Sequence, residues 1–390
     1  QVSLYAKGPD PRGGQGEFYA STWDGELGQF ITTFEGHPYL GESVMYPDMT
    51  SAFSKTVVEG GWLGTALKNY SEAEQRWIRN RASYGKLKEK IAEDFEHYVD
   101  GNKLSIGSWQ ELLSVHPEFF KETDINGPFI ARFYDNQDLL DHSVRLHTKY
   151  KALHRVLDKD EVLSRHPAFR EAVDKGLIAG GLEAPGITFN IKSVLRNMLN
   201  YLQNRGVAYF WDHEVDDIVF GDRDVIKAIR SGGQDIEADH FSFHTGAYGS
   251  ALWKNTPVEP HIGGVLGRWM LLPKPEGFTL PVKIHGDQRR EGSQQYPIVD
   301  VNLTPYTHPQ KGTPYLALGG GYMYVGGYPF TWDQENMDRV DGENERVARL
   351  YLGSFYEKAL AAGSIIQGKV MPHAGDHSHW MIDRSIKFTH

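Results

Sequence analysis

The chain has 390 residues, of which 40% are hydrophobic and 24% charged, a composition typical of a globular protein large enough for two domains. Its net charge of −10 repels phosphate backbones and argues against a nucleic-acid partner, and the absence of cysteine excludes disulfides, thiolate nucleophiles and cysteine-based metal sites. Neither a membrane span nor a signal peptide is visible, so we expect a soluble, cytoplasmic protein.

The first third of the chain combines irregular loops with charged helices. Residues 2–7 are expected to form a short strand that runs into a Gly- and Pro-rich turn, and the chain up to about residue 65 has the character of site-lining loops. A Ser71-x-x-Glu74 capping box opens a charged helical segment over 71–100. Several short helices are predicted over 107–175, because prolines interrupt the pattern there.

The clearest pattern is an amphipathic helix followed by strands. Apolar residues recur at helical spacing: Ile191, Val194, Leu195, Met198, Leu199 and Leu202. Gly206 is the expected helix stop, and short strands are predicted at 207–210, 215–220 and 225–231. After a Gly-Gly turn, a strand over 236–244 is expected to end at Thr245-Gly246. Helix, strand, hairpin, strand is the order in the middle of a dinucleotide-binding domain.

The last third is rich in strands. Residues 257–332 predict an antiparallel sheet, and a final helix is expected over 341–362. Tyr322, Tyr324 and Tyr328 alternate on one of these strands, which is typical of a core face but also compatible with a substrate pocket.

In this order of elements the chain resembles the D-amino-acid oxidase, glycine oxidase and sarcosine oxidase group of FAD-dependent oxidoreductases. The resemblance covers residues 2–8 and about 180–360. It is carried by the helix before Gly206-Val207, by the Ala238-Asp239 segment that leads to Gly246-Ala247, and by the Gly-Gly step in 319–328.

The resemblance implies an α/β fold in which a partial, Rossmann-like FAD domain is interleaved with an antiparallel β-sheet substrate domain. The FAD-binding part would comprise residues 1–65, 180–256 and 341–390. A helical insertion would span 66–179, and the substrate sheet 257–340.

The resemblance also implies site residues. FAD would contact Arg12, Gly13, Gly14, Val215, Thr245, Gly246, Ala247 and Gly326. Tyr322, Tyr324 and Arg268 would form the catalytic pocket, where a guanidinium suits a substrate carboxylate. For the 12–14 loop, an ordinary surface turn is the alternative.

Two departures from the family stand out. Ala6 occupies the position of an acidic residue that holds the adenosine ribose hydroxyls. The family's Gly-rich phosphate-binding turn would lie before Gln1, and its flavin-closing segment after His390. We therefore expect a second polypeptide, or a segment outside this sequence, to complete the FAD site in a multi-subunit assembly.

The densest histidine cluster is His373, His377 and His379, with Asp376 between them. Such spacing can bind zinc or iron, but no metal is expected, because a substrate-lining loop or a surface loop explains the cluster better. Motifs of serine hydrolases, P-loop NTPases and zincins are absent from the sequence.

The implied activity is flavin-dependent oxidation of the C–N bond of a small-molecule amine or amino acid, with FAD as the hydride acceptor. The alternative is a non-catalytic or partner-dependent subunit of the same fold that has lost independent FAD binding.

Overall fold

The structure is a computed structural model, and it describes residues 2–12, 28–32, 53–84, 88–222, 225–254, 263–278, 280–287, 298–307 and 313–375. Within these residues, a nine-stranded mixed sheet has the order β14-β10-β13-β12-β11-β3-β5-β2, with β4 paired to β5. Its strands are β2 (Gly28–Thr32), β3 (Phe129–Tyr134), β4 (Arg155–Leu157), β5 (Gly180–Asn190), β10 (Gly263–Pro273), β11 (Val282–Asp287), β12 (Ile298–Thr307), β13 (Pro314–Gly326) and β14 (Ile366–Gly375).

The antiparallel sheet expected over 257–340 is present as β10 to β13, but it is part of this larger sheet, because β11 pairs with β3 in parallel. The fold class is confirmed as mixed α/β. Two sheet strands, β3 and β4, lie inside the segment expected to be helical. The side chains of β3 are largely buried, so packing against distant strands determines its structure.

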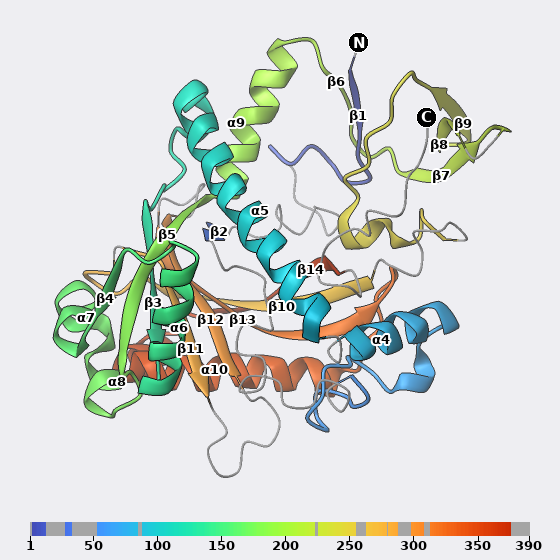
Figure 1. Ribbon diagram of the computed structural model, residues 1–390. Coiled ribbons are helices and arrows are strands. Elements are labelled where there is room, and N and C mark those ends of the chain that lie inside the picture. Colours follow the sequence, from blue (N-terminus) through green and yellow to red (C-terminus); the bar gives the residue numbers. More distant parts are fainter. Residues whose placement is uncertain are drawn as a thin grey trace.

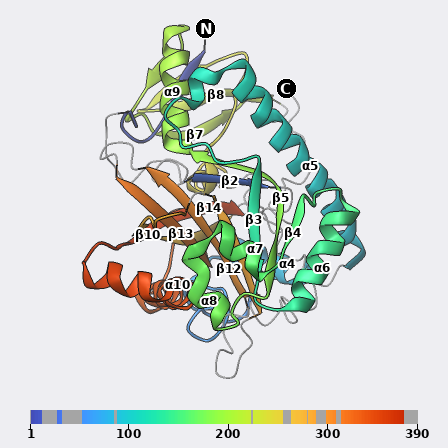
Figure 2. The same cartoon turned by 90° about the vertical axis from the view of Figure 1, so that its left-hand side faces the viewer.

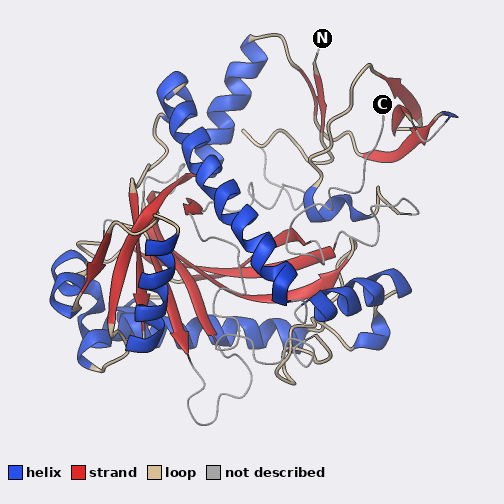
Figure 3. Cartoon of the chain, viewed as in Figure 1, coloured by secondary structure: helices blue, strands red, loops and turns tan. Residues whose placement is uncertain are grey.

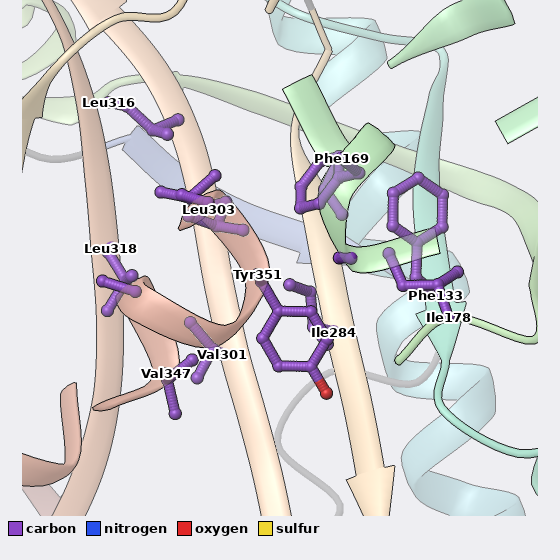
Figure 4. Close-up of a cluster of buried hydrophobic side chains, with 14 of the residues drawn as sticks. Phe133, Phe169, Ile178, Ile284, Val301, Leu303, Leu316, Leu318, Val347 and Tyr351 are labelled. Atoms are coloured by element: carbon purple, nitrogen blue, oxygen red, sulfur yellow. The ribbon is translucent and has the colours of Figure 1, made fainter. Parts of the chain in front are cut away.

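Helix α10 (Gln334–Ala361) covers one face of the large sheet (Figure 1). Its buried side chains Val347 and Tyr351 pack on Ile284, Val301 and others of the same core, as Figure 4 shows. The helix begins seven residues before the expected start at 341, and at Gly353 it contains a non-helical backbone conformation.

Apart from one short 3₁₀ helix described below, the remaining helices lie around the sheet (Figure 3): η1 (Leu67–Asn69), α4 (Glu72–Tyr84), α5 (Lys88–Val115), η2 (Pro117–Phe120), α6 (Gln137–Lys149), α7 (Lys159–Arg165), η3 (Pro167–Phe169), α8 (Arg170–Asp174) and α9 (Ile191–Asn204). The capping box before α4 is confirmed, since the backbone amide of Ser71 donates to Glu74 at 2.7 Å and that of Glu74 donates to Ser71 Oγ at 3.3 Å. None of the helices in the described residues is long and apolar enough to cross a membrane.

The elements expected of a dinucleotide-binding domain lie on the side of the sheet opposite α10 (Figures 1 and 2). Strand β1 (Ser3–Tyr5) pairs in parallel with β6 (Ala208–Phe210). Helix α9 ends in a Schellman motif, in which the amide of Val207 donates to the Leu202 carbonyl and Gly206 has φ +86. Strands β7 (Val215–Phe220), β8 (Ile226–Ser231) and β9 (Gln234–Glu237) form a three-stranded sheet.

The prediction of a strand over 236–244 is wrong. Strand β9 ends at Glu237, residues 238–245 form no strand, and a short 3₁₀ helix, η5 (Gly246–Ser250), follows. A β-strand requires a hydrogen-bonded neighbour. None of the described strands pairs with residues 238–245, so this segment forms no β-ladder.

The expected domain boundaries at residues 180 and 341 fall within elements of the large sheet and its covering layer. Strand β5 belongs to that sheet, β14 pairs with β10 in the same sheet, and α10 packs on one face of the sheet. The division into domains stays a prediction.

Candidate functional site

A transverse row of side chains crosses the face of the large sheet that is turned away from α10, which we call the inner face. Apolar residues on β11 and β12, such as Val282 and Val301, belong to the core that includes α10. Strand alternation places the residues next to them in sequence on the inner face. Direct cross-strand partners then line up in one row: Arg132, Lys283, Asn302, Gly319 and Trp269. We call these five residues the inner row.

The inner row is buried although it is largely polar. Arg132 is 2% exposed, Lys283 3% and Asn302 8%. A Cβ at Gly319 would overlap the indole ring of Trp269, so the ring lies directly over the backbone of β13. The row therefore places an aromatic wall beside an amide and two cationic groups.

The histidines next to the inner row are held neutral. Nη1 of Arg132 donates to Nε2 of His285 at 3.1 Å, which requires that nitrogen to be unprotonated. Burial, together with the charges of Arg132 and Lys283, holds the pKa of His285 well below its ordinary value. Burial and Arg132 also lower the pKa of His147 on α6 to about 3. The same positive field that disfavours a histidinium favours an anionic ligand group.

A second group of residues gathers where η5 meets the turn after β13, and it brings together most of the residues expected to bind FAD. Ser250 accepts a hydrogen bond from the amide of Tyr328 at 2.5 Å. The ring centroids of Tyr248 and Tyr328 lie 5.4 Å apart. Gly246, with φ +54, begins η5, and Gly326, with φ +78, ends β13. Thr245, Gly246 and Ala247 thus lie on the segment that packs against the turn after Gly326.

The carboxyl end of β1 joins this group. The ammonium group of Lys7 lies 2.7 Å from a carboxylate oxygen of Glu214 and 5.0 Å from the centroid of the Tyr328 ring. The amide of Asp212 donates to the carbonyl of Gly8 at 2.9 Å. Val215 follows directly and begins β7. Four segments distant in sequence therefore meet at the end of the parallel pair β1 and β6.

The side chain of Arg12 lies against α9, and its expected contact with FAD stays a prediction. Its guanidinium pairs with Asp10 and donates to Asn200 Oδ1 at 3.2 Å and to Gln203, both on α9. The hydrogen bond from Arg12 is the main reason why the pKa of Asp10 is lowered. The side chain thus fastens the β1 loop to α9. Gly13 and Gly14 lie outside the described residues.

The residues expected to be catalytic are not gathered in one pocket. Arg268 forms an ion pair with Asp341 of α10, with Nε 2.7 Å from Oδ1, so its guanidinium lies on the α10 side of the sheet. Tyr324 is on the inner face but is 1% exposed, and its ring stacks on Trp77 at 4.3 Å. The side chain of Tyr322 lies outside the described residues. Catalytic roles for the three stay predictions.

Sequence reasoning missed the inner row. Its signal is the alternation in β12, where Asn302 and Thr304 are separated by Leu303. Such alternation usually indicates a solvent-facing side, but in the folded protein Asn302 and Thr304 are buried. In the described part of the chain no group of three or more histidine or acidic residues could hold a metal. His377 and His379 lie outside it.

The sequence model of a family described as FAD dependent oxidoreductase matches residues 51–365. Glycine oxidase from Bacillus cereus ATCC 14579 is similar in structure, with 13% identity, 88% of this chain and 82% of that chain covered, and a TM-score of 0.48. L-proline dehydrogenase from P. horikoshii shows 10% identity, with 87% of this chain and 79% of that chain covered, and a TM-score of 0.46. Iminodiacetate oxidase from Chelativorans sp. BNC1 shows 13% identity, with 87% of this chain and 82% of that chain covered, and a TM-score of 0.46. No curated protein matches the chain.

Proposed function

The chain belongs to the family of FAD-dependent oxidoreductases, and we propose that it oxidises the C–N bond of an amino acid or a related amine that carries a carboxylate. FAD, when bound, accepts the hydride from the carbon next to the nitrogen. The inner row is the observation that carries the carboxylate part of the proposal, since two buried cations and an amide share one face of the sheet.

The residues at the end of β1 and β6 fit the adenosine part of FAD. In doubly wound folds, nucleotides bind at the carboxyl ends of parallel strands. Here that end carries an exposed carboxylate on Glu214, the half-buried apolar side chain of Val215, and the positive-φ turn at Gly246. These residues, together with Thr245, Ala247 and Gly326, would hold the cofactor.

The residues of the inner row would bind and orient the substrate. Lys283 donates hydrogen bonds to the carboxylate, and the amide group of Asn302 donates another, in a buried setting where charge-assisted hydrogen bonds are strong. Trp269 excludes water and limits the space beside the carbon that reacts. Lys283 and Asn302 thus fix the carboxylate end, while the amine end is left to face the cofactor.

Flavin content and Lys283 together test this function. The purified protein should show the absorption bands of bound flavin, and an amino acid should bleach them without oxygen. Lys283→Met should raise the KM for carboxylate-bearing substrates about 10- to 100-fold, the loss expected for a charged hydrogen bond. The control is Lys274→Met, an exposed lysine just beyond β10. Equal KM values in both variants would contradict the proposed role of the inner row.

One observation favours the second candidate function, a partner-dependent subunit. Residues 238–245 form no strand, and β1 has a single strand neighbour in the described part of the chain. A strand from another polypeptide, or from a segment outside this sequence, would pair with β1 and give 238–245 a neighbour. In that case the isolated chain would lack flavin, and amide hydrogen exchange at Ser3–Tyr5 would slow when the partner is added.

A further inference from the structure

The end of strand β1 lacks the acidic residue that a dinucleotide site needs at this point. In nucleotide-binding sheets, a carboxylate close to the end of the second strand accepts hydrogen bonds from the ribose hydroxyls. Ala6 follows β1 in this chain, and its methyl group cannot accept a hydrogen bond. A ribose bound at this edge would therefore need another acceptor.

Glu214 places a carboxylate at the same edge. It lies in the connection between β6 and β7, which is tied to the end of β1 by two backbone hydrogen bonds of 2.9 Å, from Asp212 to Gly8 and from His213 to Ala6. Since β1 and β6 are parallel, both carboxyl ends open on one side. The carboxylate of Glu214 thus lies at the same edge as Ala6, whose side chain cannot accept a hydrogen bond.

Lys7 fixes the direction of this carboxylate. Its ammonium group bonds to one oxygen of Glu214 at 2.7 Å and lies over the ring of Tyr328 at 5.0 Å. The Glu214 side chain is 54% exposed, so its second oxygen and the remaining lone pairs are accessible to a ligand. An exposed ion pair of this kind contributes little to stability. Ligand binding is a better reason for its placement than folding.

We propose that Glu214 accepts hydrogen bonds from the ribose hydroxyls of the adenosine half of FAD, and that Lys7 is its positioning residue. This inference rests on the proposed function only in requiring that FAD binds. The acceptor for the ribose hydroxyls would then lie in the β6–β7 connection and not at the end of β1. Val215, next in sequence, would then lie against the base.

Binding of ADP and its deoxy analogues tests the proposal without reference to catalysis. Titration calorimetry would compare ADP with 2′-deoxy-ADP and 3′-deoxy-ADP. The wild-type protein should bind at least one deoxy analogue about tenfold more weakly, the loss expected for a hydrogen bond to a charged acceptor. Glu214→Gln should weaken ADP binding by a similar factor and lose most of the discrimination. Lys7→Met should reduce the discrimination partly.

Asp216→Asn is the matched control, because Asp216 is an exposed carboxylate two residues further along the chain, on β7. It should bind ADP and the deoxy analogues as the wild type does. Unchanged melting of Glu214→Gln would show that the variant folds. If Glu214→Gln binds ADP normally and still discriminates against the deoxy analogues, this inference is overturned while FAD binding stands. If the wild-type protein binds neither ADP nor FAD, the proposed function is overturned together with it.

Discussion

The indole ring of Trp269 occupies the space in which any side chain at position 319 would begin. A Cβ on Gly319 would overlap three atoms of the ring, and the two residues are direct cross-strand partners on β10 and β13. Trp269 can therefore lie flat over the sheet and complete the inner row only because residue 319 is glycine.

Gly319→Ala should displace the Trp269 ring and destabilise the protein by about 1–3 kcal/mol, as overpacking of a buried site does. Urea unfolding followed by tryptophan fluorescence would measure both effects. Gly342→Ala is the control, because a Cβ at this helical glycine of α10 meets nothing within 4 Å. That variant should be unchanged or slightly more stable. A Gly319→Ala variant of full stability would contradict the packing described for the inner row.

Tyr324→Phe should leave stability unchanged or raise it slightly. The hydroxyl of Tyr324 is buried and has no hydrogen-bond partner in the described residues, and burial raises its pKa well above the ordinary value. Removal of an unsatisfied buried group costs nothing in hydrogen bonding. Trp77→Ala, in contrast, removes the ring that stacks on Tyr324 and should cost about 3–5 kcal/mol.

Thermal and urea unfolding of the two variants would separate these effects. A loss of about 1 kcal/mol in Tyr324→Phe would mean that the hydroxyl has a partner. A raised KM with unchanged melting would instead support the predicted role of Tyr324 in the substrate pocket.

Local patterns in the sequence predicted local structure well. Helix α9 has the expected bounds because its apolar stripe and its glycine stop lie within one segment. Strands β7 and β8 form where expected, since a hairpin closes on its own neighbour. The strand expected over 236–244 was wrong for the opposite reason, because a strand there would need a hydrogen-bonded neighbour distant in sequence, which a local pattern does not supply.

The candidate site was less predictable than the fold. The inner row takes one residue from each of five strands, and only the register of those strands brings Lys283 next to Arg132 and Asn302. Arg268 and Tyr324 were expected to share a pocket, but Arg268 faces α10 and Tyr324 packs on α4. A strand sequence gives the alternation of its faces, but it does not say which element covers each face.

Acid should destabilise the protein through His166. This side chain is fully buried among Phe133, Phe169 and Phe278, and burial, with a smaller effect of Arg165, lowers its pKa to about 4. The unfolded chain has the ordinary histidine pKa of about 6.5, so it binds a proton more readily than the folded protein does. The stability contributed by neutral His166 is complete above pH 6.5 and should fall by about 3 kcal/mol between pH 6.5 and 4.

Urea unfolding at several pH values would measure this dependence. His166→Leu should show a smaller loss of stability over the same range, because the buried titrating group is gone. His142→Gln, which changes an exposed histidine of α6, should keep the loss seen in the wild type. Identical pH profiles of His166→Leu and the wild-type protein would exclude His166 as the cause.

Gly246 offers a direct test of where the cofactor lies. It begins η5 with φ +54, a conformation that a β-branched residue adopts only with strain, so Gly246→Val should distort the turn that packs against Tyr328. We expect weaker FAD binding, measured by flavin fluorescence during titration. Gly232→Val is the matched control, since Gly232 has φ +58 and lies in the β8–β9 turn. Both substitutions should cost about 1–2 kcal/mol of stability, but only the one at Gly246 should raise the Kd for FAD. If the two variants bind FAD equally well, η5 is not part of the cofactor site, and the residues from Thr245 to Ala247 lose their proposed role.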